Sequence, residues 1–312
     1  MSSTADQPWH HAKTEINQEL KDLTTLWGVG VERRNAANRE GILRWNQDGL
    51  KAEDLGVKAK NSANTLQAIL DINNTHSEPV LPSQIDNPDQ VWRHPQKVEF
   101  YVDFETVSDL KDDFKNVPES GGTPLIFMIG CGHLEDDKWE WKCFTTDRLT
   151  EEAEGLIIDQ WMDHMYEVQN RIDPAGYTPT VYHWSHAEVS TFDSAFNSAK
   201  NRHADKEWPT LNWYDFLQEV IKKEPVVVKG AFGFGLKAIA GSLNKRGLIE
   251  TSWDAGPTDG LGAMVGAWWA DDEANSKGIT MNDIPMVQEI SQYNEVDCKV
   301  MMEIIEYLRK NH

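Results

Sequence analysis

The chain of 312 residues carries 51 acidic against 30 basic residues, a formal net charge of −21, and 39% of its residues are hydrophobic. This length allows a full hydrophobic core in one large or two modest domains, and the negative charge argues against a protein that binds DNA or RNA only through a basic surface. Three cysteines without C-x-x-C spacing predict neither a disulfide framework nor a zinc site, and the lack of a membrane-length apolar segment favours a cytoplasmic protein without a membrane partner.

Composition and hydrophobic periodicity divide the chain into four parts. A polar tail precedes a small part with helical periodicity. A stretch rich in Pro, Asn, Asp and Gln then leads to a part in which strand and helix patterns are mixed. The predicted parts are residues 1–20 (tail), 21–75 (all-α module), 76–96 (linker) and 97–312 (α/β domain).

Two glycine-bearing turns in the all-α module are each followed by an amphipathic helical pattern. The pair resembles a helix-hairpin-helix module, in which backbone N–H groups of a G-h-G turn bind a phosphate at a helix N-terminus. The resemblance implies that Gly28 and Gly30 contact nucleic acid, supported by Arg33 and Arg34. The second turn lacks the G-h-G form, so a helical bundle that serves as a lid or docking surface is an equal alternative. The candidate core residues are Ala36, Ile42, Trp45, Leu66, Ile69 and Leu70.

The segment KVEFYVDFET, residues 97–106, predicts an apolar strand with two acids on one face. Strand side chains alternate between faces, so Asp103 and Glu105 point together, opposite Phe104 and its apolar neighbours. Two carboxylates held that close repel each other, and a hard divalent cation that prefers oxygen ligands is the usual counter-ion. The alternative is an edge strand with a solvated acidic face.

Downstream segments predict further strands and helices. We expect an antiparallel pair of strands beside the first strand, then a long helix, a fourth strand and a later helix. A glycine-rich segment is expected to form a mobile loop near the site. These elements are residues 125–131 and 138–144 (strands), 148–168 (helix, with Leu149, Ala153, Leu156, Ile157 and Met165 inward), 180–184 (strand), 236–245 (helix) and 252–266 (loop).

The fourth strand leads into a helix through YHWSHAE, which places Glu188 at a strand-to-helix junction. Ser185 is a candidate N-cap, and Glu188, three positions later, would complete a capping box. The alternative is that Glu188 points at the same cation as Asp103 and Glu105. This segment alone leaves both alternatives open.

The segment YNEVDCKVMMEIIEYLRK, residues 293–310, predicts an amphipathic helix with an inward-facing acid. Helical spacing places Tyr293 and Asp297 within the apolar stripe, whereas Glu303 and other charged residues fall on the opposite face. A carboxylate that faces the core is costly unless it is paired, hydrogen-bonded or bound to metal. The alternative is a helix cap or a buried salt bridge.

In this order, the segments resemble the DEDD exonucleases of the ribonuclease H-like superfamily and, more narrowly, its YprB-like predicted nucleases. The matching segments are YVDFET, YHWSHAE, NWYDF, FGLK and YNEVDC. The resemblance covers roughly residue 98 to the C-terminus and implies a ribonuclease H-like fold, a mixed sheet flanked by helices.

The resemblance also implies a role for each acid. Asp103, Glu105, Glu188 and Asp297 would bind two ions of Mg²⁺ or Mn²⁺, and Tyr293 would assist the attacking water. The tyrosine, four positions before Asp297, matches the tyrosine subclass, whereas the third acid is Glu here and Asp in most DEDD enzymes.

The function so implied is metal-dependent hydrolysis of nucleic-acid phosphodiesters, as a 3'-to-5' exonuclease on single-stranded DNA or RNA ends. One alternative is a structure-selective endonuclease with the same chemistry. Another is a catalytically silent ribonuclease H-like fold that acts as a nucleic-acid-binding or assembly module.

Overall fold

The computed structural model describes residues 9–86, 91–107, 124–184, 191–253 and 260–312. The chain forms two compact units. The smaller unit comprises residues 1–88, 220–250 and 307–312, and the larger unit comprises residues 89–219 and 251–306. All of the predicted acids fall in the sequence of the larger unit.

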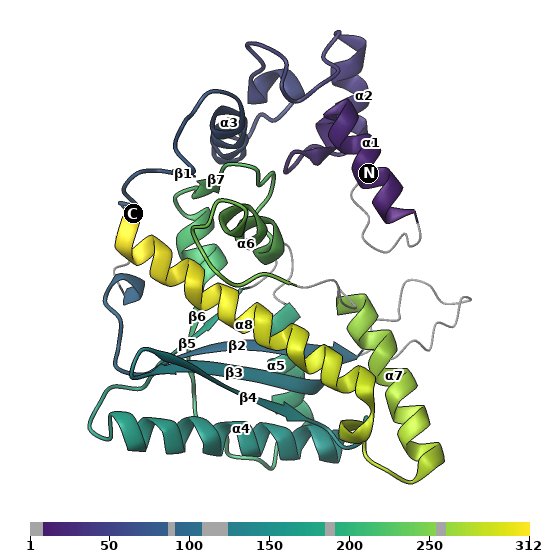
Figure 1. Ribbon diagram of the computed structural model, residues 1–312, viewed down its shortest axis with the longest axis vertical. Helices are drawn as coiled ribbons and strands as arrows, with labels where there is room; N and C mark the ends of the chain where they lie inside the picture. The colour runs from purple at the N-terminus through teal and green to yellow at the C-terminus, as the bar shows by residue number, and fades with distance from the viewer. Residues whose placement is uncertain (1–8, 87–90, 108–123, 185–190, 254–259) are drawn as a thin grey trace. The chain divides into compact units, whose positions relative to one another are not determined.

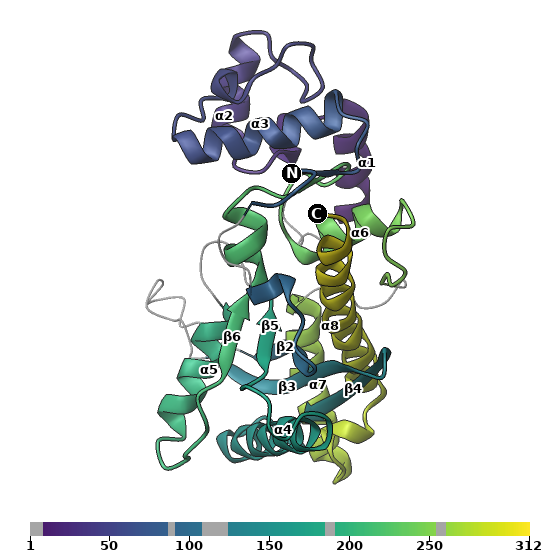
Figure 2. The ribbon, with the colours of Figure 1, turned by 90° about the vertical axis from the view of Figure 1, so that its left-hand side faces the viewer.

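A five-stranded mixed sheet organises the larger unit (Figure 1). Its strands are β2 (Glu99–Val107), β3 (Leu125–Glu135), β4 (Lys138–Thr145), β5 (Thr180–His183) and β6 (Asn212–Asp215). The spatial order is β4-β3-β2-β5-β6, which Figure 2 shows from one side. β3 pairs antiparallel with β2 and β4, while β5 runs parallel to β2 and β6. The acidic strand β2 is therefore the central strand, and the predicted antiparallel pair beside it is confirmed.

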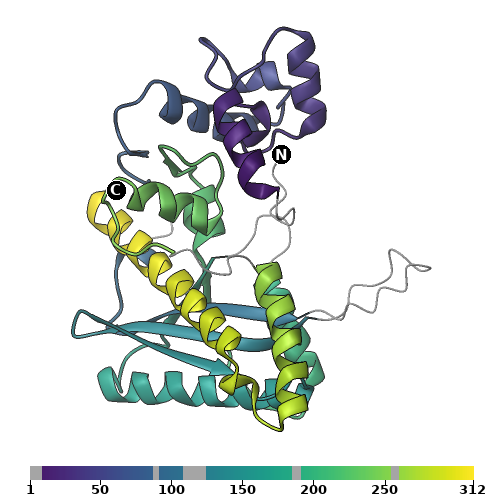
Figure 3. The same ribbon diagram turned by 45° about the vertical axis from the view of Figure 1, so that its right-hand side comes forward.

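Helices cover both faces of this sheet (Figure 3). They are α4 (Glu151–Ile172), α5 (Thr191–Arg202), α7 (Gly260–Lys277) and α8 (Pro285–Asn311). Residues of α4 and α5 pack on one face, and residues of α7 and α8 pack on the other. The expected α/β class, a mixed sheet flanked by helices, is confirmed.

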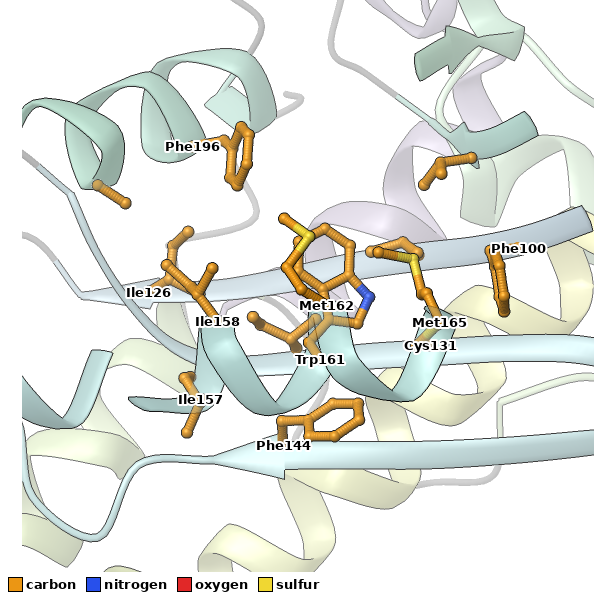
Figure 4. Packing of buried hydrophobic residues seen from close by; sticks show 14 of the residues in the cluster. Phe100, Ile126, Cys131, Phe144, Ile157, Ile158, Trp161, Met162, Met165 and Phe196 are labelled. Atoms are coloured by element: carbon orange, nitrogen blue, oxygen red, sulfur yellow. The ribbon is translucent and has the colours of Figure 1, made fainter. Parts of the chain in front are cut away.

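The face beneath α4 holds the main apolar core of the larger unit (Figure 4). At its centre Trp161 is fully buried and meets the ring of Phe104 edge-on, with centroids 5.5 Å apart. Ile157 and Met165 are buried, as the helical pattern predicts. Leu156 is 52% exposed, so its predicted inward position is wrong. The buried stripe passes through Ile157, and a step of one residue turns a helical side chain by about 100°, which takes Leu156 out of the stripe.

A buried carboxylate joins α4, β3 and the end of α5. Glu154 has no exposed surface and accepts hydrogen bonds from the Arg202 guanidinium at 2.6 Å and from the backbone N–H of Ile126 at 2.7 Å. The ring Nε2 of His203 lies 3.0 Å from its other oxygen. Because its charge is paired and its oxygens are hydrogen-bonded, this acid is satisfied within the fold.

The loop expected at residues 252–266 agrees with the structure at residues 252 and 253, which lie in no helix or strand, but is wrong at residues 260–266. Residues 260–266 form the first turns of α7, and residues 254–259 lie outside the described residues. The buried stripe of α7 consists of alanines, which give a weak hydrophobic signal but allow close packing of a helix on a sheet. These alanines are Ala263, Ala267, Ala270 and Ala274.

The smaller unit contains mostly helices in its described residues. They are α1 (His10–Leu20), α2 (Val31–Arg39), α3 (Lys60–Asn74) and α6 (Leu236–Asn244), with short 3-10 turns at Leu23–Thr25 and Ala52–Leu55 and an antiparallel pair β1 (Val80–Leu81) and β7 (Val227–Val228). In α3, Leu66, Ile69 and Leu70 are buried as predicted. In α2, Ala36 is exposed and Ala37 is buried, so that prediction is wrong by one position.

Candidate metal centre

The strand β2 directs Asp103 and Glu105 to the sheet face that α7 and α8 cover. Val102 packs in the core on the α4 side, so alternation sends its neighbour Asp103 the other way. Glu105 is 6% exposed and Asp103 is half-buried. The pairing of β2 with β3 shifts register between Glu105 and Thr106, and such a bulge changes the aim of the neighbouring side chains.

The helix α8 adds a third carboxylate. Asp297 is 8% exposed, so it faces inward as the helical spacing indicates. Asp103, Glu105 and Asp297, here called the acidic triad, each offer a carboxylate oxygen, and these atoms lie within 4.8 Å of one another. In the described parts of the chain, no other three His, Cys, Asp or Glu residues converge in this way. Three acids that are far apart in the sequence therefore form one cluster that could hold a metal ion.

Two neutral groups donate hydrogen bonds to the acidic triad. The amide Nδ2 of Asn294 donates to Oδ2 of Asp103 at 2.9 Å, and the indole Nε1 of Trp253 donates to Oδ1 of Asp297 at 2.9 Å. Such bonds orient the carboxylates and stabilise their charged forms without cancelling their charge. The negative charge of the cluster is thus kept available for a cation.

Tyr293 precedes Asp297 by one helical turn, and its phenol is hydrogen-bonded to the Asp297 side chain. Burial raises the pKa of Tyr293 well above its ordinary value, and the charges of Asp297, Glu105 and Asp103 raise it further. The phenol is therefore neutral at any physiological pH. It can donate a hydrogen bond, but it cannot act as a general base.

The structure brings together four of the five residues predicted for the catalytic site: Asp103, Glu105, Tyr293 and Asp297. Glu188, the fifth, lies outside the described residues. Whether its side chain completes a capping box or joins the acidic cluster therefore stays open.

Sequence reasoning missed Asn294 and Trp253. A signal existed for Asn294, because the spacing that turns Asp297 inward also turns residue 294 inward, and Asn294 has no exposed surface. No comparable signal existed for Trp253, whose bond to Asp297 joins residues 44 positions apart.

The residues predicted to bind nucleic acid lie at the start of α2. Gly28 has a φ of 74°, which favours glycine, and Gly30 is the N-cap residue. The guanidinium of Arg33 donates to the carbonyl of Gly28, and Arg34 lies 3.8 Å from the carboxylate of Asp22. Both arginines thus contact their own unit, where Arg33 helps to fix the glycine turn.

The second turn of the smaller unit has a backbone similar to the first. Gly56 has a φ of 71° and follows a 3-10 turn, as Gly28 does. The position that matches Gly30 holds Lys58, which accounts for the missing G-h-G form in the sequence. The two turns therefore share their positive-φ glycine, although only the first has the full motif.

Two histidines lie on the opposite face of the sheet from the acidic triad. His133 is 3% exposed, and neither of its ring nitrogens has a hydrogen-bond partner among the described residues. Its Nε2 lies 3.6 Å from the Glu135 carboxylate, which is too far for a hydrogen bond. Burial lowers the pKa of His133 and lowers that of His164 to about 4, with a smaller contribution at His164 from Lys142.

Comparison of the chain with protein-family models and with curated proteins found no match. In the described part of the chain, no helix combines the length and the apolar character that crossing a bilayer requires.

Proposed function

We propose that this chain is a divalent-metal-dependent nuclease that hydrolyses nucleic-acid phosphodiesters with Mg²⁺ or Mn²⁺ bound at the acidic triad. The observation that carries the proposal is the convergence of three carboxylates, two from the central strand and one from α8, within 4.8 Å. A mixed sheet with the acidic strand at its centre, an antiparallel pair on one side and parallel strands on the other, supports the resemblance to the ribonuclease H-like superfamily.

The chemistry of the cluster fits a hard divalent cation. Its ligands would all be carboxylate oxygens, which Mg²⁺ and Mn²⁺ prefer over sulfur or nitrogen. Glu105 and Asp297 are nearly buried, and like charges at this spacing repel each other strongly unless a cation offsets them. Nitrogen and sulfur ligands, which zinc prefers, are absent from this group of three.

The residues of the proposed site have separate roles. When bound, the ions would supply activation of a water molecule and charge stabilisation for a phosphodiester. Asp103 and Glu105 are held by a central strand, which fixes their separation. Tyr293 stays neutral and its one O–H donates to the Asp297 carboxylate, so its phenol oxygen would orient the water by accepting a hydrogen bond from it.

The finer assignments come from the family resemblance. It gives Glu188 as the fourth acid, two ions in place of one, and 3'-to-5' cleavage of single-stranded ends. In the smaller unit, the separate resemblance to a helix-hairpin-helix module gives Gly28 and Gly30 as backbone contacts to a phosphate, with Arg33 and Arg34 nearby. In a chain with a net charge of −21, such local contacts would have to bring the strand to the acidic site.

The test is an assay of end-labelled single-stranded DNA and RNA with Mg²⁺, Mn²⁺ or EDTA. The wild-type chain is compared with Asp103→Asn and with Asp215→Asn as a matched control. Asp215 is also an acid at the end of a strand, but its Oδ1 accepts the backbone N–H of Gln218 at 3.0 Å and it lies outside the acidic triad.

We expect metal-dependent cleavage by the wild type and by Asp215→Asn, and a loss of at least about 10²-fold with Asp103→Asn. Stepwise release of nucleotides from the 3' end identifies an exonuclease, whereas internal fragments identify an endonuclease. Equal cleavage by wild type and Asp103→Asn, or none by the wild type with either metal, contradicts the proposed function.

A further inference from the structure

A fully buried amide is positioned against the acidic triad. Asn294 lies on α8 between Tyr293 and Asp297 and has no exposed surface. Its Nδ2 donates to Oδ2 of Asp103 at 2.9 Å and approaches the backbone carbonyl of the same residue at 3.3 Å. One amide group therefore contacts both the side chain and the main chain of Asp103.

Asn294 reaches Asp103 because residue 130 is a glycine. Gly130 pairs directly with Asp103 across β2 and β3, on the same face of the sheet. A Cβ atom on Gly130 would lie 2.9 Å from Cγ of Asn294 and closer still to its Oδ1. The φ of Gly130 is not in the left-handed region, so it is space and not backbone conformation that requires glycine here.

The contact has an orienting effect that packing alone does not provide. A buried amide is costly unless it is hydrogen-bonded, so an apolar side chain would fill this position at lower cost. The carboxylate of Asp103 is repelled by Glu105 and Asp297, and rotation of its side chain would relieve that repulsion. The bond from Asn294 opposes this rotation.

We infer that Asn294 is a positioning residue for the acidic triad: it holds the Asp103 carboxylate in the orientation that binds a cation, and Gly130 provides the space that it needs. This inference rests on the proposed metal site. Groups that hydrogen-bond to a metal ligand typically change metal affinity by about 10–100-fold when they are removed.

The experiment measures Mn²⁺ binding by calorimetry and electron paramagnetic resonance, with thermal unfolding in EDTA as a separate readout. The variants are Asn294→Ala, Gly130→Ala and the double variant. Ala at position 130 displaces the amide, whereas in the double variant its methyl group occupies the space that the shortened residue 294 leaves. Ile290→Val, a buried change one turn earlier on α8, is the control for lost packing.

We expect each single variant to bind Mn²⁺ about 10–100-fold more weakly and Ile290→Val to bind like the wild type. The double variant should regain thermal stability but not affinity. If its affinity returns together with its stability, or if Asn294→Ala binds like the wild type, Asn294 only packs and the inference is overturned.

Asn294→Leu, which keeps the size of the side chain and removes its donor, replaces Asn294→Ala should that variant not fold. Wild-type affinity in Asn294→Leu overturns the inference. A wild-type chain that binds no Mn²⁺ at all overturns the proposed metal site and this inference with it, an outcome distinct from equal affinities in wild type and variant.

Discussion

Replacing Glu105 with Gln is expected to stabilise the metal-free protein, although it removes a proposed ligand. The change keeps the shape of the side chain and removes one of three negative charges whose oxygens lie within 4.8 Å. At 4.8 Å, two unit charges repel by about 3.5 kcal/mol at an effective dielectric constant of about 20, and by about 0.9 kcal/mol in water. Because Glu105 faces two other carboxylates, its neutralisation relieves about 2–7 kcal/mol, with the lower end applying where solvent screens the half-buried Asp103.

Thermal unfolding in EDTA and in Mn²⁺ tests whether Glu105→Gln raises or lowers the stability of the metal-free protein. The wild-type Tm should rise with Mn²⁺, because a ligand that binds only the folded state stabilises it. The Tm of Glu105→Gln should start higher in EDTA and respond little to Mn²⁺.

Glu154→Gln is the matched control, because Glu154 is also a buried acid but is paired with Arg202. Breaking that pair should cost about 3–5 kcal/mol in either condition. If Glu105→Gln lowers the Tm in EDTA, the fold stabilises the charge of Glu105 and its neighbours do not oppose it, which contradicts this prediction.

Three further predictions concern single side chains. The pKa values of His133 and His164 in the folded protein lie below the unfolded value of about 6.5, so the free energy of unfolding should be highest above that pH and fall toward pH 4. His164→Phe should make this fall smaller, and a urea midpoint that stays constant from about pH 6.5 to about pH 4 would contradict the prediction. Tyr293→Phe should lower kcat strongly because the phenol is lost, and should weaken Mn²⁺ binding by no more than about 10-fold, because it removes a hydrogen bond to Asp297 but no ligand; an unchanged kcat would show that the ring only packs. Trp253→Phe, which keeps an aromatic ring but removes the N–H donor to Asp297, should weaken Mn²⁺ binding by about 10-fold in a titration, and wild-type affinity would exclude this role.

Local periodicity was sufficient to orient the acids of the site. A period of two places Asp103 and Glu105 on one face of β2, and a period of 3.6 turns Asp297 inward on α8. Both depend only on the neighbouring residues, so they can be worked out from the sequence. That the two faces meet depends on the topology of the sheet, which here was expected from a family resemblance and not from periodicity.

The features that sequence reasoning missed arise from contacts between distant segments. Gly130 looks like an ordinary glycine in a strand, and only the approach of Asn294 from α8 explains it. α7 was missed because its buried stripe consists of alanines, whose small size matters only when the packing partner is known. The exposed position of Leu156 shows a third case, in which the predicted helical face was one residue too wide.

Anomalous scattering from crystals grown with Mn²⁺ would locate an ion at the acidic triad. The proposed site predicts an anomalous peak bound by carboxylate oxygens of Asp103, Glu105 and Asp297, and its loss in crystals of Asp103→Asn. A second peak that shares these acids and also contacts Glu188 would support the two-ion assignment. A fully ordered acidic triad without a peak at saturating Mn²⁺, or Mn²⁺ bound only elsewhere on the chain, would contradict the proposed metal site.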